Sequence, residues 1–432
     1  MIRFIYNLLW PIGLLFFLPR YLVKMFRRGG YREKFGQRFG IYDANVRKRL
    51  GDDKLTWLHA VSVGEARIAL KFAAELRHDQ PELRGVLTTT TTTGFAFATR
   101  NAPSWIEVMY NPLDFWPIVR RAFRTINPAR IVLVEAEIWP NLVAEAHQRG
   151  VPIALINARL SSRSEKRFRR FRPLVAPTFR LLELICVQEA ADVERWNALG
   201  VSRDRIRVTG SIKFDPSDTQ ADASFAEKIL AELKLADRRP VLLGGSTHPG
   251  EEQILATVFL ELRSDFPGLL LILAPRHVER AREIQRGLEQ LGLRAAIRSN
   301  VSDASAADCL IIDSTGELQN WYGVADVVFI GKSIAAIGGQ NPVEPVAAGK
   351  PVIFGPHMEN FAVLARDLVE KRGATQIQST TELKAAVVDL LNHPRLRETL
   401  VENARLVIEK HRGATALTAK LVAELKGGHV QE

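Results

Sequence analysis

Three observations predict an α/β protein with two parallel sheets. Short apolar runs typical of buried strands alternate with helical segments whose apolar residues recur every three or four positions. This alternation is typical of strand–helix–strand units and therefore of parallel sheets. It stops over residues 214–238, a charged stretch with one helical segment, and then starts again. We therefore expect two Rossmann-like domains, joined near residues 212–222.

The expected strands form two sets, one on each side of this break. The first set covers residues 55–62, 85–91, 106–111, 130–138, 152–158, 182–188 and 206–211. The second set covers residues 240–247, 269–276, 294–299, 308–315, 326–333 and 351–356. Helices are expected between the strands and from residue 380 onward. With 432 residues, of which 47% are hydrophobic, the chain has enough apolar side chains for two such cores.

The first residues differ from the rest of the chain. Residues 4–18 carry no charge, and as a helix they would span about 22 Å, against roughly 30 Å for a bilayer core. Extending the run to Val23 reaches that length but includes Arg20. Lys24, Arg27 and Arg28 follow directly, and no small-residue cleavage site of a signal peptide is present. We expect residues 1–28 to be an N-terminal membrane anchor with its basic flank on the cytoplasmic side. An interfacial helix and a core helix of a soluble domain are the alternatives.

The charge balance points to anionic partners. The chain has 59 Lys and Arg against 48 Asp and Glu, a net charge of +11. Nucleic acid, phosphates and a membrane surface all fit this excess. Nucleic acid is not expected, because no basic–aromatic interleaving or known binding motif is present. The basic run at 163–173 suits lipid phosphates or anionic headgroups, and a solvated helix face is the alternative.

Cysteine and metal-ligand chemistry are not expected in the site. Cys186 and Cys309 lie in apolar strand-like runs and are read as buried core thiols. The sequence offers no cluster of His, Cys and Asp with the spacing of a metal site. Neither a disulfide framework nor a resident metal is therefore expected.

Polar residues at the expected carboxyl ends of the strands are candidate site residues, because ligands of open α/β sheets bind there. Glu65 follows Ser62 and Gly64 at a helix start. It acts there either through the helix dipole alone or as a general base. Glu135 and Glu137 follow a buried strand, where a carboxylate without partners lowers the free energy of unfolding. Their presence there therefore indicates a functional role or bound partners.

Two further features lie at strand ends of the first set. Lys213 follows the last strand, where a cation could stabilise a departing phosphate, and an ordinary surface lysine is the alternative. The threonine-rich segment at residues 88–94 suits substrate hydroxyls or phosphate. Its alternative is β-propensity combined with helix capping.

The second set of strand ends suits an anionic ligand. Ser246 and His248 lie in a Gly-rich turn before a helix, which resembles a phosphate-cradling turn without being a Walker motif. Arg276 and His277 follow the next strand. Glu344 follows a Gly-rich stretch at a helix start, where its carboxylate can accept hydrogen bonds from both hydroxyls of a ribose. Simple capping is its alternative.

Six segments follow one another along the chain: HAVSVGE (59–65), TTTTTTG (88–94), EAEIWPN (135–141), GSIKFD (210–215), LAPRH (273–277) and NPVEP (341–345). In this order, they resemble the motifs of the 3-deoxy-D-manno-octulosonic acid (Kdo) transferases of lipopolysaccharide synthesis. The resemblance covers essentially the whole chain and implies the GT-B glycosyltransferase fold, with two Rossmann-like domains facing a cleft and an N-terminal membrane anchor. One departure is Thr91, where many members have Pro.

The resemblance implies a reaction and residue roles. The reaction is the inverting transfer of Kdo from CMP-Kdo to the lipid A precursor, lipid IVA, without an active-site metal or cofactor. Glu65 matches the general base, Glu137 a second essential carboxylate and Lys213 a cation that supports the transition state. The residues matching the CMP-binding segments are Pro275, Arg276, Gly316, Glu317, Leu318, Asn341, Pro342, Val343 and Glu344. Possible further substrate-binding residues are Ser62, Gly64, Ser246, His248 and His277.

The resemblance also implies a domain plan and a location. Residues 1–28 would be the anchor, residues 29–212 the acceptor-binding domain and residues 213–432 the CMP-sugar-binding domain with the C-terminal helices. The catalytic body would lie on the cytoplasmic side of the inner membrane, with the membrane surface as a partner. Another GT-B glycosyltransferase that uses a UDP-sugar is the nearest alternative. A non-hydrolysing nucleotide-sugar epimerase shares the fold but has no need of an anchor.

Overall fold

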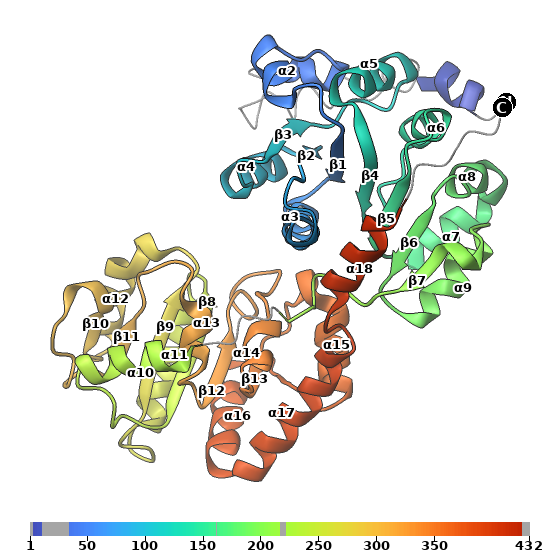
Figure 1. The fold of residues 1–432 in the computed structure, drawn as a ribbon. Helices are drawn as coiled ribbons and strands as arrows, with labels where there is room; N and C mark the ends of the chain where they lie inside the picture. The colour runs from blue at the N-terminus through green and yellow to red at the C-terminus, as the bar shows by residue number, and fades with distance from the viewer. Residues whose placement is uncertain (1–2, 11–33, 161, 217–221, 426–432) are drawn as a thin grey trace. The chain divides into compact units, whose positions relative to one another are not determined.

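The chain folds into two compact units, each built on one parallel sheet (Figure 1). The computed structural model describes residues 3–10, 34–160, 162–216 and 222–425. Unit 1 contains the chain up to Asp215 and the chain from Gly413 onward, and unit 2 is Pro216–Arg412. The prediction of an α/β protein with two parallel sheets is confirmed, and each expected strand has a counterpart in the described chain.

Unit 1 has a seven-stranded sheet of order β3-β2-β1-β4-β5-β6-β7. Its strands are β1 (Leu55–Ala60), β2 (Gly85–Thr89), β3 (Ile106–Tyr110), β4 (Pro128–Val134), β5 (Ile153–Ala158), β6 (Leu184–Val187) and β7 (Ile206–Val208). Its helices are α2 (Ala44–Leu50), α3 (Val63–Asp79), α4 (Thr92–Asn101), α5 (Trp116–Ile126), α6 (Pro140–Gln148), α7 (Ser162–Arg170), α8 (Arg172–Phe179), α9 (Ala190–Ala198) and α18 (Ala414–Ala423). The strand order reverses between β1 and β4, the place where doubly wound sheets bind ligands.

Strand β1 shows why these runs read as continuously apolar. All its residues are buried, since the sheet is covered on both faces. Leu55 and Trp57 pack in the core of one face, and Leu58 and Ala60 in the core of the other. Successive side chains of a strand point to opposite faces, so one short run contributes to both cores.

The last helix, α18, belongs to unit 1, whereas the sequence analysis placed it in the second domain. Ala419 and Val422 pack in the same core as residues of β1 and α3. The Asp215 carboxylate accepts hydrogen bonds from the Gly413 N–H at 3.0 Å and from the Thr415 N–H at 2.8 Å, so it caps this helix. The expected boundary at residue 213 also differs, because residues 213–215 are part of unit 1.

Unit 2 has a seven-stranded sheet of order β10-β11-β9-β8-β12-β13-β14. Its strands are β8 (Val241–Thr247), β9 (Leu270–Pro275), β10 (Ala295–Ile297), β11 (Cys309–Ile311), β12 (Val327–Ile330), β13 (Val352–Phe354) and β14 (Thr375–Gln376). Its helices are α10 (Ala223–Glu232), α11 (Glu251–Leu262), α12 (Ala281–Gln290), α13 (Leu318–Tyr322), α14 (Val343–Ala347), α15 (Ala362–Glu370), α16 (Thr380–Asn392) and α17 (Pro394–Glu409). Strand β14 was not expected, and at two residues it is too short to give a periodic signal.

Residues 3–10 form a short helix of unit 1. Arg3 Nε and Asn7 Nδ2 donate hydrogen bonds to Asn141 Oδ1 at 3.1 and 2.8 Å, and Trp10 stacks on Phe115. Within the described part of the chain, every helix is too short or too polar to span a bilayer. Most of the expected anchor, residues 11–28, lies outside the described residues, so the anchor stays a prediction.

Candidate active site

Glu65 lies in the first turn of α3, just beyond the carboxyl end of β1. Its Oε1 accepts a hydrogen bond from Ser62 Oγ at 2.8 Å, and its Oε2 accepts one from the Val61 N–H at 2.8 Å. Ser62 Oγ in turn accepts from the Glu65 N–H at 3.3 Å, which completes a capping box. These bonds place Glu65 in the helix cap and fix its carboxylate where the sheet order reverses.

Glu135 and Glu137 lie close enough to Glu65 for the three carboxylates to interact electrostatically. Burial, and then the charges of Glu65 and Glu135, raise the pKa of Glu137 to about 7. Burial and the charge of Glu65 also raise the pKa of Glu135. Glu135 has a φ of 62°, a left-handed conformation that is uncommon for residues other than glycine. Strands β1 and β4 are neighbours, which brings the residues that follow them together.

Lys213 supplies positive charge to this carboxylate cluster. Burial lowers its pKa, and the charge of Glu135 acts in the opposite direction. Asn157, at the end of β5, accepts hydrogen bonds from the Ile212 N–H and from Ser211 Oγ, which fixes the segment before the lysine. Arg159 follows β5, and its charge acts against the rise in the pKa of Glu135. Sequence reasoning gave no role to Arg159, although its place directly after a predicted strand is a usable signal.

A buried histidine holds the segment that carries Glu137. Trp139 Nε1 donates to His59 Nε2 at 3.2 Å, and His59 Nδ1 lies 3.0 Å from Thr88 Oγ1. Burial lowers the pKa of His59 to about 4, so the ring is neutral near pH 7. Because Nε2 accepts, Nδ1 carries the proton and donates to Thr88, whose hydroxyl donates to the Leu58 carbonyl. The interaction of Glu137 with Trp139 acts against the rise in the pKa of this glutamate.

The threonine-rich segment has structural partners in unit 1. Thr88 is fully buried in the network around His59. Thr91 caps α4, because its Oγ1 accepts from the Gly94 N–H at 3.1 Å and donates to the Val61 carbonyl at 2.9 Å. For these two residues the structure supports the interpretation by strand propensity and capping. A hydroxyl at position 91 also stabilises the helix start directly.

Unit 2 gathers basic and polar side chains at the carboxyl ends of β8 and β9. The Arg276 N–H donates to the Thr247 carbonyl at 3.0 Å, and the rings of His248 and His277 meet edge to face at 5.9 Å. His248 Nε2 lies 3.1 Å from Gln340 Nε2. Burial, and then the charges of Lys332, His277 and Arg276, lower the pKa of His248. Ser246, with a φ of 53°, turns the chain at the end of β8.

Glu251 organises these loops, a role that the sequence analysis missed. Its Oε2 accepts hydrogen bonds from the N–H groups of His248 and Lys332 at 2.8 and 2.7 Å. Its Oε1 accepts from the N–H groups of Ser333 and Ile334 at 2.9 and 3.2 Å. The side chain is fully buried, and these four donors satisfy its charge. It therefore holds the turn after β8 against the turn after β12.

The residues implied in CMP binding all lie in unit 2, in segments that follow β9, β11 and β12. They are Pro275 and Arg276 at the end of β9, Gly316, Glu317 and Leu318 before and at the start of α13, and Asn341, Pro342, Val343 and Glu344 around the start of α14. These strands are neighbours or near neighbours in the sheet, so the whole set lies on the side of the sheet where the strands have their carboxyl ends.

Two carboxylates of this set already have protein partners. Asn341 Nδ2 donates to Glu344 Oε1 at 3.0 Å, while Asn341 Oδ1 accepts from the Val343 N–H at 3.0 Å. Glu317 accepts hydrogen bonds from Arg298 and from Ser314. Glu344 is thus positioned at the helix start by its own motif, and Glu317 is held in an ion pair.

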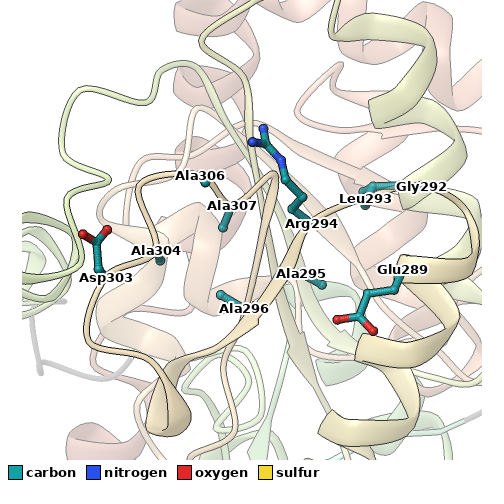
Figure 2. A pocket seen from close by; sticks show the side chains of 10 residues that line it. All are labelled: Glu289, Gly292, Leu293, Arg294, Ala295, Ala296, Asp303, Ala304, Ala306 and Ala307. Atoms are coloured by element: carbon teal, nitrogen blue, oxygen red, sulfur yellow. The ribbon is translucent and has the colours of Figure 1, made fainter.

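A pocket of about 500 Å³ lies on the opposite side of this sheet, where the strands have their amino ends (Figure 2). It lies near the amino ends of β10 and β11, and half of its lining residues are alanines, with Glu289, Arg294 and Asp303 as its charged side chains. Arg294 forms an ion pair with Asp308 at 3.0 Å. Ligands of parallel sheets bind beyond the carboxyl ends of the strands, so this pocket is not the candidate site.

Comparison with known proteins identifies the family. A family model described as 3-Deoxy-D-manno-octulosonic-acid transferase (kdotransferase) matches residues 33–216. The 3-deoxy-D-manno-octulosonic acid transferase of Haemophilus influenzae is 33% identical over 389 residues, which are 89% of this chain and 89% of the relative. This chain belongs to the Kdo transferase family. The Kdo transferase of Chlamydophila psittaci is 30% identical over 413 residues, 95% of this chain and 94% of the relative.

Solved structures of lower identity show the fold of this Kdo transferase. UDP-GlcNAc 2-epimerase from Neisseria meningitidis, bound to UDP-GlcNAc, is 12% identical with a TM-score of 0.54, and the match covers 86% of this chain and 99% of that one. Anabaena Alr3699/HepE in complex with UDP is 15% identical with a TM-score of 0.51, covering 86% and 100%. These likenesses show a GT-B-like fold with two parallel sheets. Family membership makes the chain a glycosyltransferase.

Proposed function

We propose that this Kdo transferase moves Kdo from CMP-Kdo to the lipid A precursor, lipid IVA, with inversion at the anomeric carbon. The observation that carries the proposal is the cluster of Glu65, Glu135 and Glu137 with Lys213 at the carboxyl edge of the unit 1 sheet. Transfer to a hydroxyl needs one base to accept its proton, and a carboxylate fixed at a strand end can do this.

In the proposed reaction, Glu65 accepts the proton of the acceptor hydroxyl. The acceptor oxygen forms a bond to the anomeric carbon while the bond from that carbon to the phosphate oxygen breaks. CMP leaves with the bonding electron pair, and attack from the opposite side inverts the configuration. Lys213 supplies positive charge beside the carboxylates, and Glu137 acts as the second carboxylate of the site. No metal or cofactor is part of this step.

We propose that the donor is bound by unit 2. Arg276 is placed to attract the phosphate of CMP, and the rings of His248 and His277 lie beside it as hydrogen-bonding groups, since cations and N–H donors at strand ends suit anions. Asn341 and Glu344 are placed for the ribose hydroxyls. CMP carries one phosphate, so positively charged side chains suffice to balance the leaving group.

The nucleotide preference tests this function. CMP should raise the melting temperature of the protein by several degrees, since a ligand that binds only the folded state stabilises it. The Arg276→Gln variant should lose most of this rise. Arg294→Gln is the matched control, because it removes an arginine at the opposite edge of the same sheet and should keep the full rise. Stabilisation by UDP and not by CMP would favour a UDP-sugar transferase and contradict the proposal.

We also propose that the body is attached to the cytoplasmic side of the inner membrane by its N-terminal segment. The helix at residues 3–10 supports this, because Phe4, Ile5, Leu8 and Leu9 are between 47% and 72% exposed. Their spacing places them on one face, while Arg3 and Asn7 bind unit 1 from the other. Such a face suits the acyl region of a bilayer.

Leu8→Glu should reduce binding to vesicles that contain anionic lipids several-fold, because it places a charge on the apolar face. Leu406→Glu is the matched control, since Leu406 on α17 is 69% exposed and Leu8 is 61% exposed. Sedimentation with vesicles measures the bound fraction. Equal binding of the two variants would contradict the role of this helix. Deleting residues 1–28 is a poorer test, because it uncovers Asn141, which is otherwise fully buried.

A further inference from the structure

Lys332 has a backbone conformation that is unusual for its side chain. It follows β12 with a φ of 60°, in the left-handed region that glycine occupies most readily. Its N–H donates to Glu251 at 2.7 Å and its carbonyl accepts from the Gly339 N–H at 2.8 Å. A bulky residue in this conformation persists when its surroundings determine it, and such residues cluster at functional sites.

The fixed backbone directs the lysine side chain across the Gly-rich loop. A Cβ atom built on Gly338 would lie 3.3 Å from Lys332 Nζ, so the ammonium lies directly over this glycine. Gly338 and Gly339 have φ values of 131° and 68°, and neither presents a side chain to a ligand. Asn360 Nδ2 would lie 2.8 Å from the same Cβ position, so an amide and the ammonium lie side by side over Gly338.

The same carboxylate oxygen of Glu251 binds the N–H groups of His248 and Lys332, which makes these two residues neighbours. His248 in turn contacts His277, which follows Arg276. Among the described residues, no carboxylate forms an ion pair with Lys332. Its ammonium therefore adds a cation to the basic edge of the unit 2 sheet.

We propose that Lys332 binds the phosphate of the CMP-sugar donor and so contributes to donor affinity. The inference rests on the proposed function, since it assumes that unit 2 binds CMP. Lysine is suited to this role as a compact point charge with three donors. The lysine contributes no proton and no electrons to the reaction, and its effect is on binding.

The test uses Lys332→Gly with two companion variants of the full chain. Lys332→Gly removes the ammonium and keeps the left-handed backbone available. Lys234→Gly is the matched control, because Lys234 has a φ of 58° and its ammonium contacts Asp303, which lines the pocket at the opposite edge of the sheet. Lys332→Arg keeps the positive charge. Any change in stability from relaxing the backbone should be shared by the two glycine variants.

Calorimetric titration with CMP and with cytidine measures the contact. Lys332→Gly should bind CMP about tenfold more weakly, the effect of one charge-assisted hydrogen bond, and should bind cytidine as the wild type does. Lys234→Gly should match the wild type for both ligands, and Lys332→Arg should keep most of the CMP affinity. Unchanged CMP affinity in Lys332→Gly overturns the assignment, including the case in which only the KM for CMP-Kdo rises. A wild-type protein that fails to bind CMP overturns the proposed function instead.

Discussion

Replacing Glu65 by Gln should lower the rate of Kdo transfer about 10³-fold and leave the affinity for CMP unchanged. The reason is chemical, since an amide cannot take the proton that a general base removes in the transition state. Gln still accepts hydrogen bonds, and it occupies this position of a capping box as readily as Glu. The Gln carbonyl oxygen can keep the bond from the Val61 N–H, and its amide NH2 can donate to Ser62 Oγ in place of the bond that Glu65 accepts from it, so the start of α3 should keep its structure. Transfer assays and CMP titration measure the two effects.

The chain offers a matched control in a second capping box. Ser379 caps α16, where its Oγ accepts from the Glu382 N–H at 3.2 Å, and Glu382 accepts from the Gln378 N–H at 2.8 Å. Glu382→Gln should therefore show the structural effect of the exchange without the chemical one. Transfer at the wild-type rate by Glu65→Gln would exclude its role as base. An equal loss in both variants would assign the effect to capping.

Replacing Glu137 by Gln should lower transfer about 10²-fold and raise thermal stability at alkaline pH. The pKa of Glu137 rises from its usual 4.5 to about 7, chiefly through burial. Between these two values the folded state holds a proton that the unfolded state has lost. The stability that comes from this proton is complete below pH 4.5 and is lost as the pH rises through 7. Gln stays neutral throughout, so its advantage over the carboxylate should grow with pH.

Melting temperatures at pH 5 and pH 8 test the direction in which the stability difference between Glu137→Gln and the wild type changes with pH. The difference between Glu137→Gln and the wild type should be small at pH 5, where both side chains are neutral, and larger at pH 8. Glu382→Gln on the exposed start of α16 serves again as the control and should show no such trend. A difference that is the same at both pH values, or that shrinks toward pH 8, would contradict the assigned pKa.

The strands and the first carboxylate could be predicted because their signals are local. A buried strand such as β1 reads as a short apolar run, and the Ser62-x-x-Glu65 spacing lies within one helical turn. The proximity of Glu65 to Glu135 and Glu137 could not be predicted from local signals. It depends on β1 lying beside β4, and these strands are separated by β2 and β3 in the sequence. Both segments are candidates because ligands of open α/β sheets bind at the carboxyl ends of strands. Only the resemblance to Kdo transferases indicates that the two segments belong to one site.

The roles of Glu251 and Lys332 could not be predicted for a related reason. The four N–H groups that bind Glu251 come from residue 248 and residues 332–334, which are distant in the chain. Nothing in the sequence around Lys332 shows that its φ is positive, since that conformation is imposed by these partners. The membership of α18 in unit 1 is equally invisible locally, because an apolar helix face can pack on either sheet.

The capping of α18 by Asp215 has a consequence for how the protein is made. Unit 1 is discontinuous, since its last helix is translated only after all of unit 2. On the ribosome, the unit with the carboxylate cluster stays incomplete until α18 emerges, whereas unit 2 is one continuous segment that can fold earlier. A premature stop before Ala414 would therefore leave the core under α3 exposed, and the damage would fall on the unit whose sheet is translated first.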